Sequence, residues 1–292
     1  MVLMAVMIAS CQNTETPNTL RTGKVNIVVD ETFAPLIADQ AYVFESTYTE
    51  SKLNMIYRPE NDVLKLFLTD SVRMAILSRE LTSSEAKFYE NKNIKLRVNR
   101  FAIDGLALIV NRTNLDSLVT VEEIIFVMQG KRSRIKNLVF DNPNSSTVRF
   151  LKELAGVKEL PKSGIYALNS NPEVINYVID NPGSIGVIGI NWIIQPEEDM
   201  EEVVKGVKIL GVKNLPGKPG SDGYYKPNQN DLAEEVYPLT RNLYIVNGEG
   251  KSGLGTGFAT FIAGERGQRI VLKSGLLPDS LPSRQVIINN NN

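Results

Sequence analysis

The chain of 292 residues contains no histidine and one cysteine, and these two shortages exclude more than the rest of its composition does. Without histidine there is no Ser-His-Asp or Cys-His catalytic arrangement and no histidine-ligated zinc. One cysteine cannot form an internal disulfide, a CxxC pair or an iron–sulfur site. Lys and Arg number 32 and Asp and Glu 33, so no overall basic field attracts nucleic acid. Most common hydrolase and metalloenzyme chemistries are excluded, and we expect no catalytic residue, metal or cofactor.

The cysteine, Cys11, stands where an apolar segment meets a polar one. The first nine residues are all apolar, which is too short for a spanning helix of about 20 residues but typical of a signal peptide. The arrangement resembles the lipobox of bacterial lipoproteins, so we interpret 1–10 as a signal peptide and 11–22 as a lipidated cysteine followed by a polar tether. The alternative is an incidental thiol near a chain end. No Lys or Arg precedes the apolar run, so we expect this leader to be truncated.

The rest of the chain alternates between short apolar runs and amphipathic segments. The apolar runs predict strands at 25–30, 53–58, 73–78, 94–111, 138–141, 184–190, 207–212 and 239–247. The amphipathic segments predict helices at 35–48, 61–69, 83–91, 121–130, 147–156 and 172–181, and one C-terminal helix over 256–275. Because strands separated by helices form βαβ units, we expect an α/β fold with largely parallel sheets.

The most informative loop lies at 140–150, where a predicted strand leads into a predicted helix. Ser145, Ser146 and Thr147 fall on the first turn of that helix. A helix N-terminus offers unpaired N–H groups and positive partial charge, and hydroxyl groups beside it favour an anion. The alternative is a simple helix cap, worth about 1 kcal/mol, but a cap explains one hydroxyl and not three in a row.

Two further loops follow strands in the first half of the chain. Thr32 can cap the helix after 25–30, and Ser78 and Arg79 end the strand at 73–78. The carboxyl ends of parallel strands face a crevice, where an arginine can bind an oxyanion with two parallel hydrogen bonds. The alternative for Arg79 is an exposed surface charge. Three such loops together indicate an anion site more strongly than each one alone.

Seven segments, in this order, resemble the phosphate-binding proteins of bacterial ABC transporters, a family of class II periplasmic-type solute-binding proteins. They are 32–35, 75–81, 104–111, 118–131, 144–150, 181–188 and 237–246. The resemblance implies two α/β lobes, each a mostly parallel sheet flanked by helices. Strands near 104–111 and 239–247 would cross between the lobes as a hinge. It divides the chain into lobe 1 at 23–105 plus 245–292 and lobe 2 at 106–244.

The resemblance also implies which residues contact the ligand. Carried over by position, they are Thr32, the backbone N–H of Phe33, Ser78, Arg79, Asp141, Ser145, Ser146 and Thr147.

Two of these positions depart from the family pattern. Arg79 stands where the family has an acidic residue, and Asp141 stands where it has an arginine. Our hypothesis is that the two charges are exchanged, so that Arg79 neutralises the anion and Asp141 accepts a phosphate O–H. The family's serine-rich loop is replaced by 57–62, where either Arg58 or Glu60 could contribute.

The function implied by the resemblance is capture of inorganic phosphate and its delivery to an ABC permease. We expect a monomeric lipoprotein in the cell envelope, facing the periplasm and held to a membrane by its lipid, with no enzymatic activity and no nucleic-acid partner. One alternative keeps the class but changes the ligand to sulfate, molybdate or tungstate. Another is a surface lipoprotein that senses or adheres and binds ligand weakly.

Overall fold

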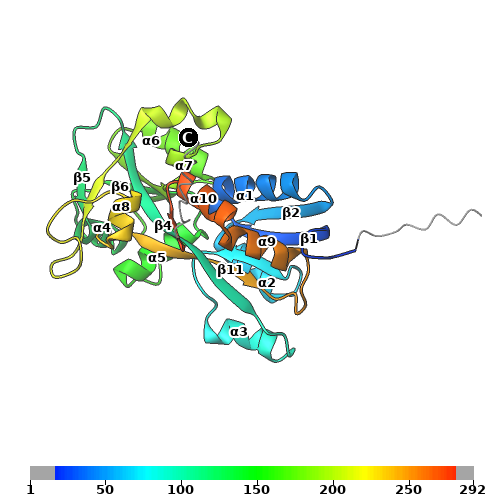
Figure 1. The fold of residues 1–292 in the computed structure, drawn as a ribbon. Helices are drawn as coiled ribbons and strands as arrows, with labels where there is room; N and C mark the ends of the chain where they lie inside the picture. Colours follow the sequence, from blue (N-terminus) through cyan, green and yellow to red (C-terminus); the bar gives the residue numbers. More distant parts are fainter. Residues whose placement is uncertain (1–16, 281–292) are drawn as a thin grey trace, which may run out of the picture.

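The structure is a computed structural model that describes residues 17–280. The proposed leader, Cys11 and the first part of the tether lie outside the described residues. Two lobes are joined by long strands that run from one into the other (Figure 1). The sheet order is β2-β1-β3-β11-β4-β8-β6-β7, with β12 and β9 also paired to β4. The predicted α/β fold is confirmed.

Lobe 1 is built on three parallel strands, with β1 between β2 and β3. The strands are β1 (Gly23–Asp30), β2 (Ser51–Arg58) and β3 (Met74–Leu77). The helices that connect them are η1 (Glu31–Phe33), α1 (Ala34–Thr47) and α2 (Glu60–Leu68), and α3 (Ser83–Glu90) follows β3. All four residues of β3 are buried, as expected for a strand covered on both faces. The parallel arrangement places the carboxyl ends of β1 and β3, which precede η1 and Ser78, at one edge.

Lobe 2 is built on β6 between β7 and β8, all parallel, so their carboxyl ends also share an edge. Its strands are β5 (Leu118–Thr120), β6 (Asn137–Phe140), β7 (Ile165–Ala167), β8 (Ser184–Gly189), β9 (Val207–Ile209) and β10 (Gly211–Lys213). Its helices are α4 (Val121–Met128), α5 (Ser146–Ala155), α6 (Asn171–Asp180), α7 (Asn191–Ile194), η2 (Glu198–Met200), η3 (Val203–Gly206) and α8 (Gln229–Ala233).

Two antiparallel strands belong to both lobes. They are β4 (Arg97–Asn111) and β11 (Thr240–Asn247). The first part of β4 pairs with β11, and the next residues, Leu106–Ile109, pair with β8 of lobe 2. Gly105 lies at the changeover, where a Cβ atom would come within 2.6 Å of the Pro227 side chain. Through their pairing with β3 of lobe 1 and β8 of lobe 2, the crossing strands lie beside the strands of both lobes.

The C-terminal segment returns to lobe 1 as α9 (Leu254–Ala263), α10 (Glu265–Lys273) and β12 (Leu277–Pro278). The ring of Phe44 in α1 packs edge-on against Phe258 and Phe261 of α9, with centroids 5.4 Å apart in both pairs. The single helix predicted over 256–275 is wrong, because Gly264 is extended and separates α9 from α10. Gly267 then lets the two helices meet closely, since a Cβ there would lie 2.4 Å from the Phe261 carbonyl oxygen.

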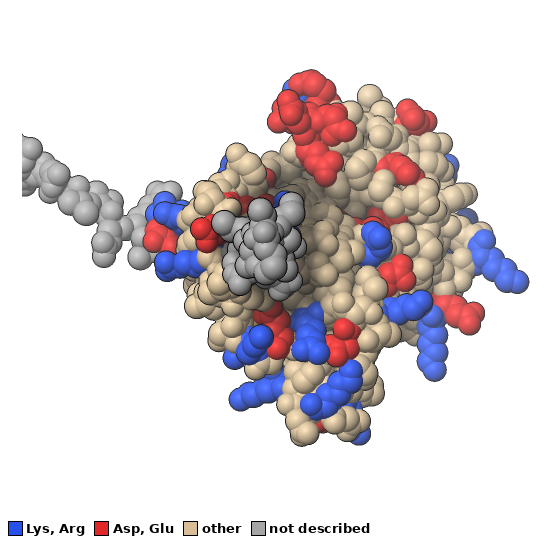
Figure 2. Space-filling model, turned by 90° about the vertical axis from the view of Figure 1, so that its right-hand side faces the viewer, with Lys and Arg blue, Asp and Glu red and all other residues tan. Residues whose placement is uncertain are grey.

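Charge is unevenly spread over the surface. Figure 2 shows acidic side chains gathered at the top of the molecule, where the segment of η2 and η3 lies, and Lys and Arg scattered lower on the same face. In residues 17–280, no helix combines the length and the hydrophobicity that crossing a bilayer requires.

Candidate functional site

The hydroxyl loop of lobe 2 joins β6 to α5, and its three hydroxyl residues, Ser145, Ser146 and Thr147, are buried. Ser145 is the N-cap of α5, and its Oγ accepts from the backbone N–H of Val148 at 3.3 Å. Ser146 and Thr147, on the first turn, are fully buried and play no part in this cap. The Thr147 Oγ1 has no hydrogen-bond partner in the described part of the chain. Capping thus accounts for one hydroxyl and leaves two for other contacts.

The facing loop of lobe 1 joins β1 to α1 through η1. Asp30 caps η1, because its Oδ1 accepts from the Thr32 N–H at 3.1 Å. The Thr32 Oγ1 lies 3.4 Å from Asp141 Oδ2 and 3.4 Å from Ser146 Oγ, across the gap between the lobes. The Thr32 carbonyl accepts from Trp192 Nε1 at 2.8 Å. Residues more than a hundred positions apart therefore meet at Thr32.

The cation of this cluster comes from the crossing strand β11. The Arg241 guanidinium donates from Nε to Asp104 Oδ2 at 2.9 Å and from one terminal nitrogen to Ser146 Oγ at 2.8 Å. It also lies over the Phe33 ring, with its carbon 4.7 Å from the ring centroid. The other terminal nitrogen is buried without a partner among residues 17–280. Arg241 thus contacts residues of both lobes and keeps one donor free.

Three aspartates surround this arginine, and all three are fully buried: Asp30, Asp104 and Asp141. Burial raises the pKa of Asp30 to about 6, with a further contribution from the charge of Glu60. Burial also raises the pKa of Asp104 and of Asp141, opposed in both by the charge of Arg241. Across residues 17–280, no three or more acidic side chains are arranged to hold a metal ion.

A second cluster links the lobes beside the first. Glu60, at the start of α2, is buried and accepts from the Arg149 guanidinium of α5 at 2.5 and 3.1 Å. Ser78 donates to Glu60 at 3.1 Å and accepts from Arg149 at 2.9 Å. This is an ion pair between lobe 1 and lobe 2, with Ser78 bound to both partners.

Arg79 belongs to this second cluster and not to the hydroxyl cluster. Its two terminal nitrogens each donate to the Glu85 carboxylate at 2.8 Å, and its Nε lies 3.7 Å from Glu60. The segment 57–62 offered two candidate residues, Arg58 and Glu60. Glu60 is buried in this cluster, whereas Arg58 donates to the carbonyl of the neighbouring Tyr57.

The sequence predicted that these loops form one anion site, but it did not point to several residues that take part in the two clusters. Those missed are Asp30, Asp104, Arg149, Asn171, Asn191, Trp192 and Arg241. A usable signal existed for Asp104, which is the one charged residue in the apolar run 101–110, and Arg241 stands opposite it in the β4–β11 register. A buried charge calls for a partner.

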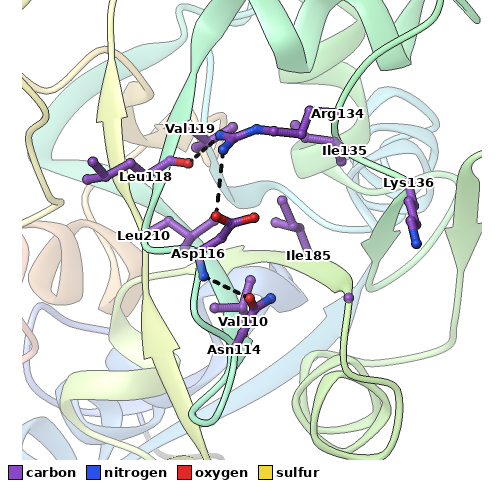
Figure 3. A pocket seen from close by; sticks show the side chains of 11 residues that line it. Val110, Asn114, Asp116, Leu118, Val119, Arg134, Ile135, Lys136, Ile185 and Leu210 are labelled. Carbon is purple, nitrogen blue, oxygen red and sulfur yellow. Dashed lines mark hydrogen bonds and ion pairs between the residues drawn. The ribbon is translucent and has the colours of Figure 1, made fainter.

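A separate hollow of about 220 Å³ lies at the far end of the lobe 2 strands (Figure 3). It is lined by residues at the starts of β6 and β8, such as Lys136 and Ile185, whereas Asp141 follows the end of β6. Arg134 on its rim donates to the Leu118 carbonyl at 2.8 Å and lies 3.7 Å from Asp116. The Asn114 side chain in turn accepts from the Asp116 N–H at 3.0 Å, so several polar groups of the hollow bind one another.

The chain is similar to known proteins over most of its length. The profile of the "PBP superfamily domain" matches residues 14–266. The phosphate-binding protein PstS of Staphylococcus aureus is 22% identical over 227 residues, 73% of this chain and 65% of that protein, a little under two thirds of its length. PstS of Staphylococcus saprophyticus is 25% identical over 207 residues, 67% of this chain and 61% of that protein.

Solved structures share the fold. A substrate-binding protein from Clostridium perfringens, solved with bound phosphate, has a TM-score of 0.72 and 21% identity, covering 88% of this chain and all of that one. An ABC-type phosphate transport receptor from Vibrio cholerae has a TM-score of 0.64 and 19% identity, with coverage of 88% and 100%. With its two lobes, its crossing strands and the match over residues 14–266, the chain belongs to the PBP superfamily of periplasmic-type binding proteins.

Proposed function

We propose that this protein is a solute-binding protein that holds inorganic phosphate between its lobes and delivers it to an ABC permease. The observation that carries the proposal is the buried cluster around Arg241. It unites hydroxyls of both lobes with a guanidinium, and it leaves one arginine nitrogen and the Thr147 Oγ1 without partners in the described chain. Free buried donors beside a helix N-terminus are what an oxyanion needs. The names of the staphylococcal relatives support phosphate as the ligand.

In this proposal Arg241 takes the role that the sequence suggested for Arg79. The Arg79 donors are directed at Glu85, whereas Arg241 is bonded to Ser146 at the start of α5. Ser145, Ser146 and Thr147, Thr32 and the Phe33 N–H surround the anion, and Asp141 accepts a phosphate O–H. A carboxylate that needs a ligand proton rejects sulfate, which has none. Ser78 acts on closure through Glu60 and Arg149.

The proposed mechanism is closure of two lobes, and no bond is broken. Contacts between lobes at Thr32 with Ser146 and at Glu60 with Arg149 exist only when the lobes are together. A ligand that touches both lobes stabilises that closed state over an open one. The permease would then receive the closed, loaded protein.

The test is calorimetric titration of the protein with phosphate, sulfate, molybdate and tungstate. We expect phosphate to bind and the Ser146→Ala variant to lose at least tenfold in affinity, because a charge-assisted hydrogen bond is removed. Ser83→Ala is the matched control, since Ser83 is the first residue of α3 as Ser146 is of α5, yet it is exposed. Binding of another oxyanion in place of phosphate would change the ligand, and no binding of any would refute the proposal.

We also propose that Cys11 carries a lipid that holds the protein to a membrane of the cell envelope. The support is the apolar run before it and the polar segment after it. In cells, a Cys11→Ser variant is expected to move from the membrane fraction to the soluble fraction and to lose incorporated labelled fatty acid. Equal membrane association of both forms would count against the anchor.

A further inference from the structure

The buried cluster holds more negative than positive charge. Arg241 and Asp104 pair at 2.9 Å, and their side chains are 2% and 0% exposed, so these two charges balance each other. Asp30 of lobe 1 and Asp141 of lobe 2 are equally buried and have no cation of their own in this cluster. Glu60, which adds to the negative field at Asp30, has its own cations in Arg149 and Arg79. After Asp104 is paired with Arg241, the cluster therefore still holds two carboxyl groups without a cation, Asp30 and Asp141.

Each of these two carboxyl groups has one occupied and one free oxygen. Asp30 Oδ1 accepts from the Thr32 N–H, and Asp141 Oδ2 accepts from the side chains of Thr32 and Asn171. The second oxygens, Asp30 Oδ2 and Asp141 Oδ1, are buried and have no partner among the residues described. A buried carboxylate oxygen without a donor is costly. A ligand that binds against these two oxygens has to bring donors to them.

Resting on the proposed phosphate function, we infer that the site selects the doubly protonated, singly charged oxyanion, dihydrogen phosphate. Asp30 and Asp141 each accept one of its two O–H groups. The free nitrogen of Arg241 and the hydroxyl of Thr147 bind its two remaining oxygens. The two protonated oxygens of the ligand thus donate to the two carboxylates, and its two unprotonated oxygens accept from Arg241 and Thr147. Hydrogen phosphate has one O–H and leaves one carboxylate facing a bare oxygen, whereas sulfate has none and leaves both.

The groups that face the two carboxyls come from both lobes. Asp30 is faced by Arg241, Glu60, the Ser146 hydroxyl and Thr32. Asp141 is faced by Arg241, Ser145, Asn171, Thr32 and the backbone N–H groups of Asp141 and Asn142, and it lies near the half-buried Glu31. In the set, Arg241 is the one cation, and the pKa of Glu31 is raised to about 7 by burial and by the charges of Asp141 and Asp30. With one cation among several carboxyl groups, this part of the cluster favours protonated groups over ionised ones.

The inference predicts that binding takes up a proton when the free ligand is hydrogen phosphate. At about pH 8.5 free phosphate carries one proton, so forming the bound state takes about one proton from the buffer. We expect calorimetry in two buffers of different ionisation enthalpy to show this uptake. We also expect affinity for total phosphate to fall about tenfold between about pH 7.5 and 8.5.

Variants locate the effect. Asp30→Asn and Asp141→Asn each remove one carboxylate, so hydrogen phosphate satisfies the remaining one, and proton uptake at alkaline pH is expected to vanish in both. The double variant is expected to gain sulfate binding. Asp116→Asn, at a side chain 70% exposed, should keep the wild-type profile.

The outcomes separate the two proposals. Phosphate affinity that is flat across this range, with no proton uptake by the unmodified protein, would overturn the inference and leave the proposed function standing. No phosphate binding at any pH would overturn both. The measurement on the unmodified protein decides the matter even if a variant fails to fold.

Discussion

Arg241 is fixed by groups from both lobes and from its own sheet. Its carboxylate partner, Asp104, faces it on the adjacent strand β4, its hydroxyl partner Ser146 belongs to lobe 2, and the ring beneath it, Phe33, belongs to lobe 1. Buried ion pairs contribute little net stability, but removal of one partner leaves an uncompensated charge. Stability and binding at this residue can therefore be separated by choosing which partner is removed.

Arg241→Gln is expected to lower the free energy of unfolding by about 3–5 kcal/mol, because Asp104 is left buried and unpaired. The double variant Arg241→Gln/Asp104→Asn should recover most of that loss, since no charge is left alone. Neither variant should bind phosphate, because the only guanidinium in the cluster is gone. Urea unfolding and calorimetry measure the two effects. Phosphate binding by the double variant would contradict the role of Arg241.

The buried carboxyl groups also determine how stability depends on pH without ligand. The pKa of Asp30 is about 6 in the folded protein against 3.8 as its ordinary value, and the pKa values of Asp104 and Asp141 are raised too. The folded state therefore binds protons more tightly than the unfolded state, and the free energy of unfolding rises as pH falls through about 6. The pKa of Glu85, lowered to about 2 beside Arg79, has the opposite effect, but only at more acidic pH.

We expect the ligand-free protein to melt at a higher temperature at about pH 5 than at about pH 8. Asp30→Asn should raise the melting temperature at the higher pH and shrink the difference, because asparagine does not titrate. The exposed Asp116 provides a control by the same substitution. A melting temperature that drops on going from the higher pH to the lower one would show that these carboxyls ionise without cost.

At the scale of elements, helix α5 contributes residues to both clusters. Its first turn supplies Ser146 and Thr147 to the anion cluster, and Arg149 reaches Glu60 at the start of α2. Glu60 is buried and Arg149 is 21% exposed with the lobes together, and we expect water to reach Glu60 when they part. This pair therefore bears on the balance between open and closed states more than on folding.

Arg149→Met is expected to weaken phosphate binding about tenfold, because closure would bury Glu60 without its hydrogen-bonded cation and reduce the population of the binding-competent state. The remaining cation, Arg79, lies 3.7 Å from Glu60 and has its terminal nitrogens bonded to Glu85. Adding Glu60→Gln should recover most of the loss. Arg134→Met is the control, since Arg134 pairs with Glu123 inside lobe 2 and is 54% exposed. Calorimetry of the variants measures the effect, and unchanged affinity in Arg149→Met would exclude the ion pair from closure.

Periodicity predicted the elements better than it predicted the site. The strand at 25–30 and the helix at 147–156 lie within one or two residues of β1 and α5, because apolar spacing is a local property. Arg79 and Arg241 show the limit of prediction from local apolar spacing. Both arginines end or interrupt an apolar run, but which one enters the cluster depends on Glu85 and on the β4–β11 register, and neither is visible in local spacing.

At the scale of the whole molecule, β4 pairs first with β11 and then, after Gly105, with β8 of lobe 2, so we expect opening to bend this strand near Gly105. The lobes also touch at their outer rim, where the Asn61 N–H donates to the Asn144 carbonyl at 3.3 Å and their side chains bond at 3.2 Å. Both residues are exposed. Their distance therefore reports closure without disturbing the buried cluster.

Cysteines at 61 and 144 are expected to form a disulfide several-fold faster with saturating phosphate than without it, because the backbones are close enough only when the lobes are together. The native Cys11 is replaced by serine so that only these thiols react. Cysteines at 26 and 54 are the control, since Asn26 and Asn54 are paired on neighbouring strands of lobe 1, with side chains bonded at 3.0 Å. That pair should oxidise at one rate with or without phosphate. If phosphate leaves the rate of the cross-lobe pair unchanged while still binding, the ligand does not act by closing the lobes.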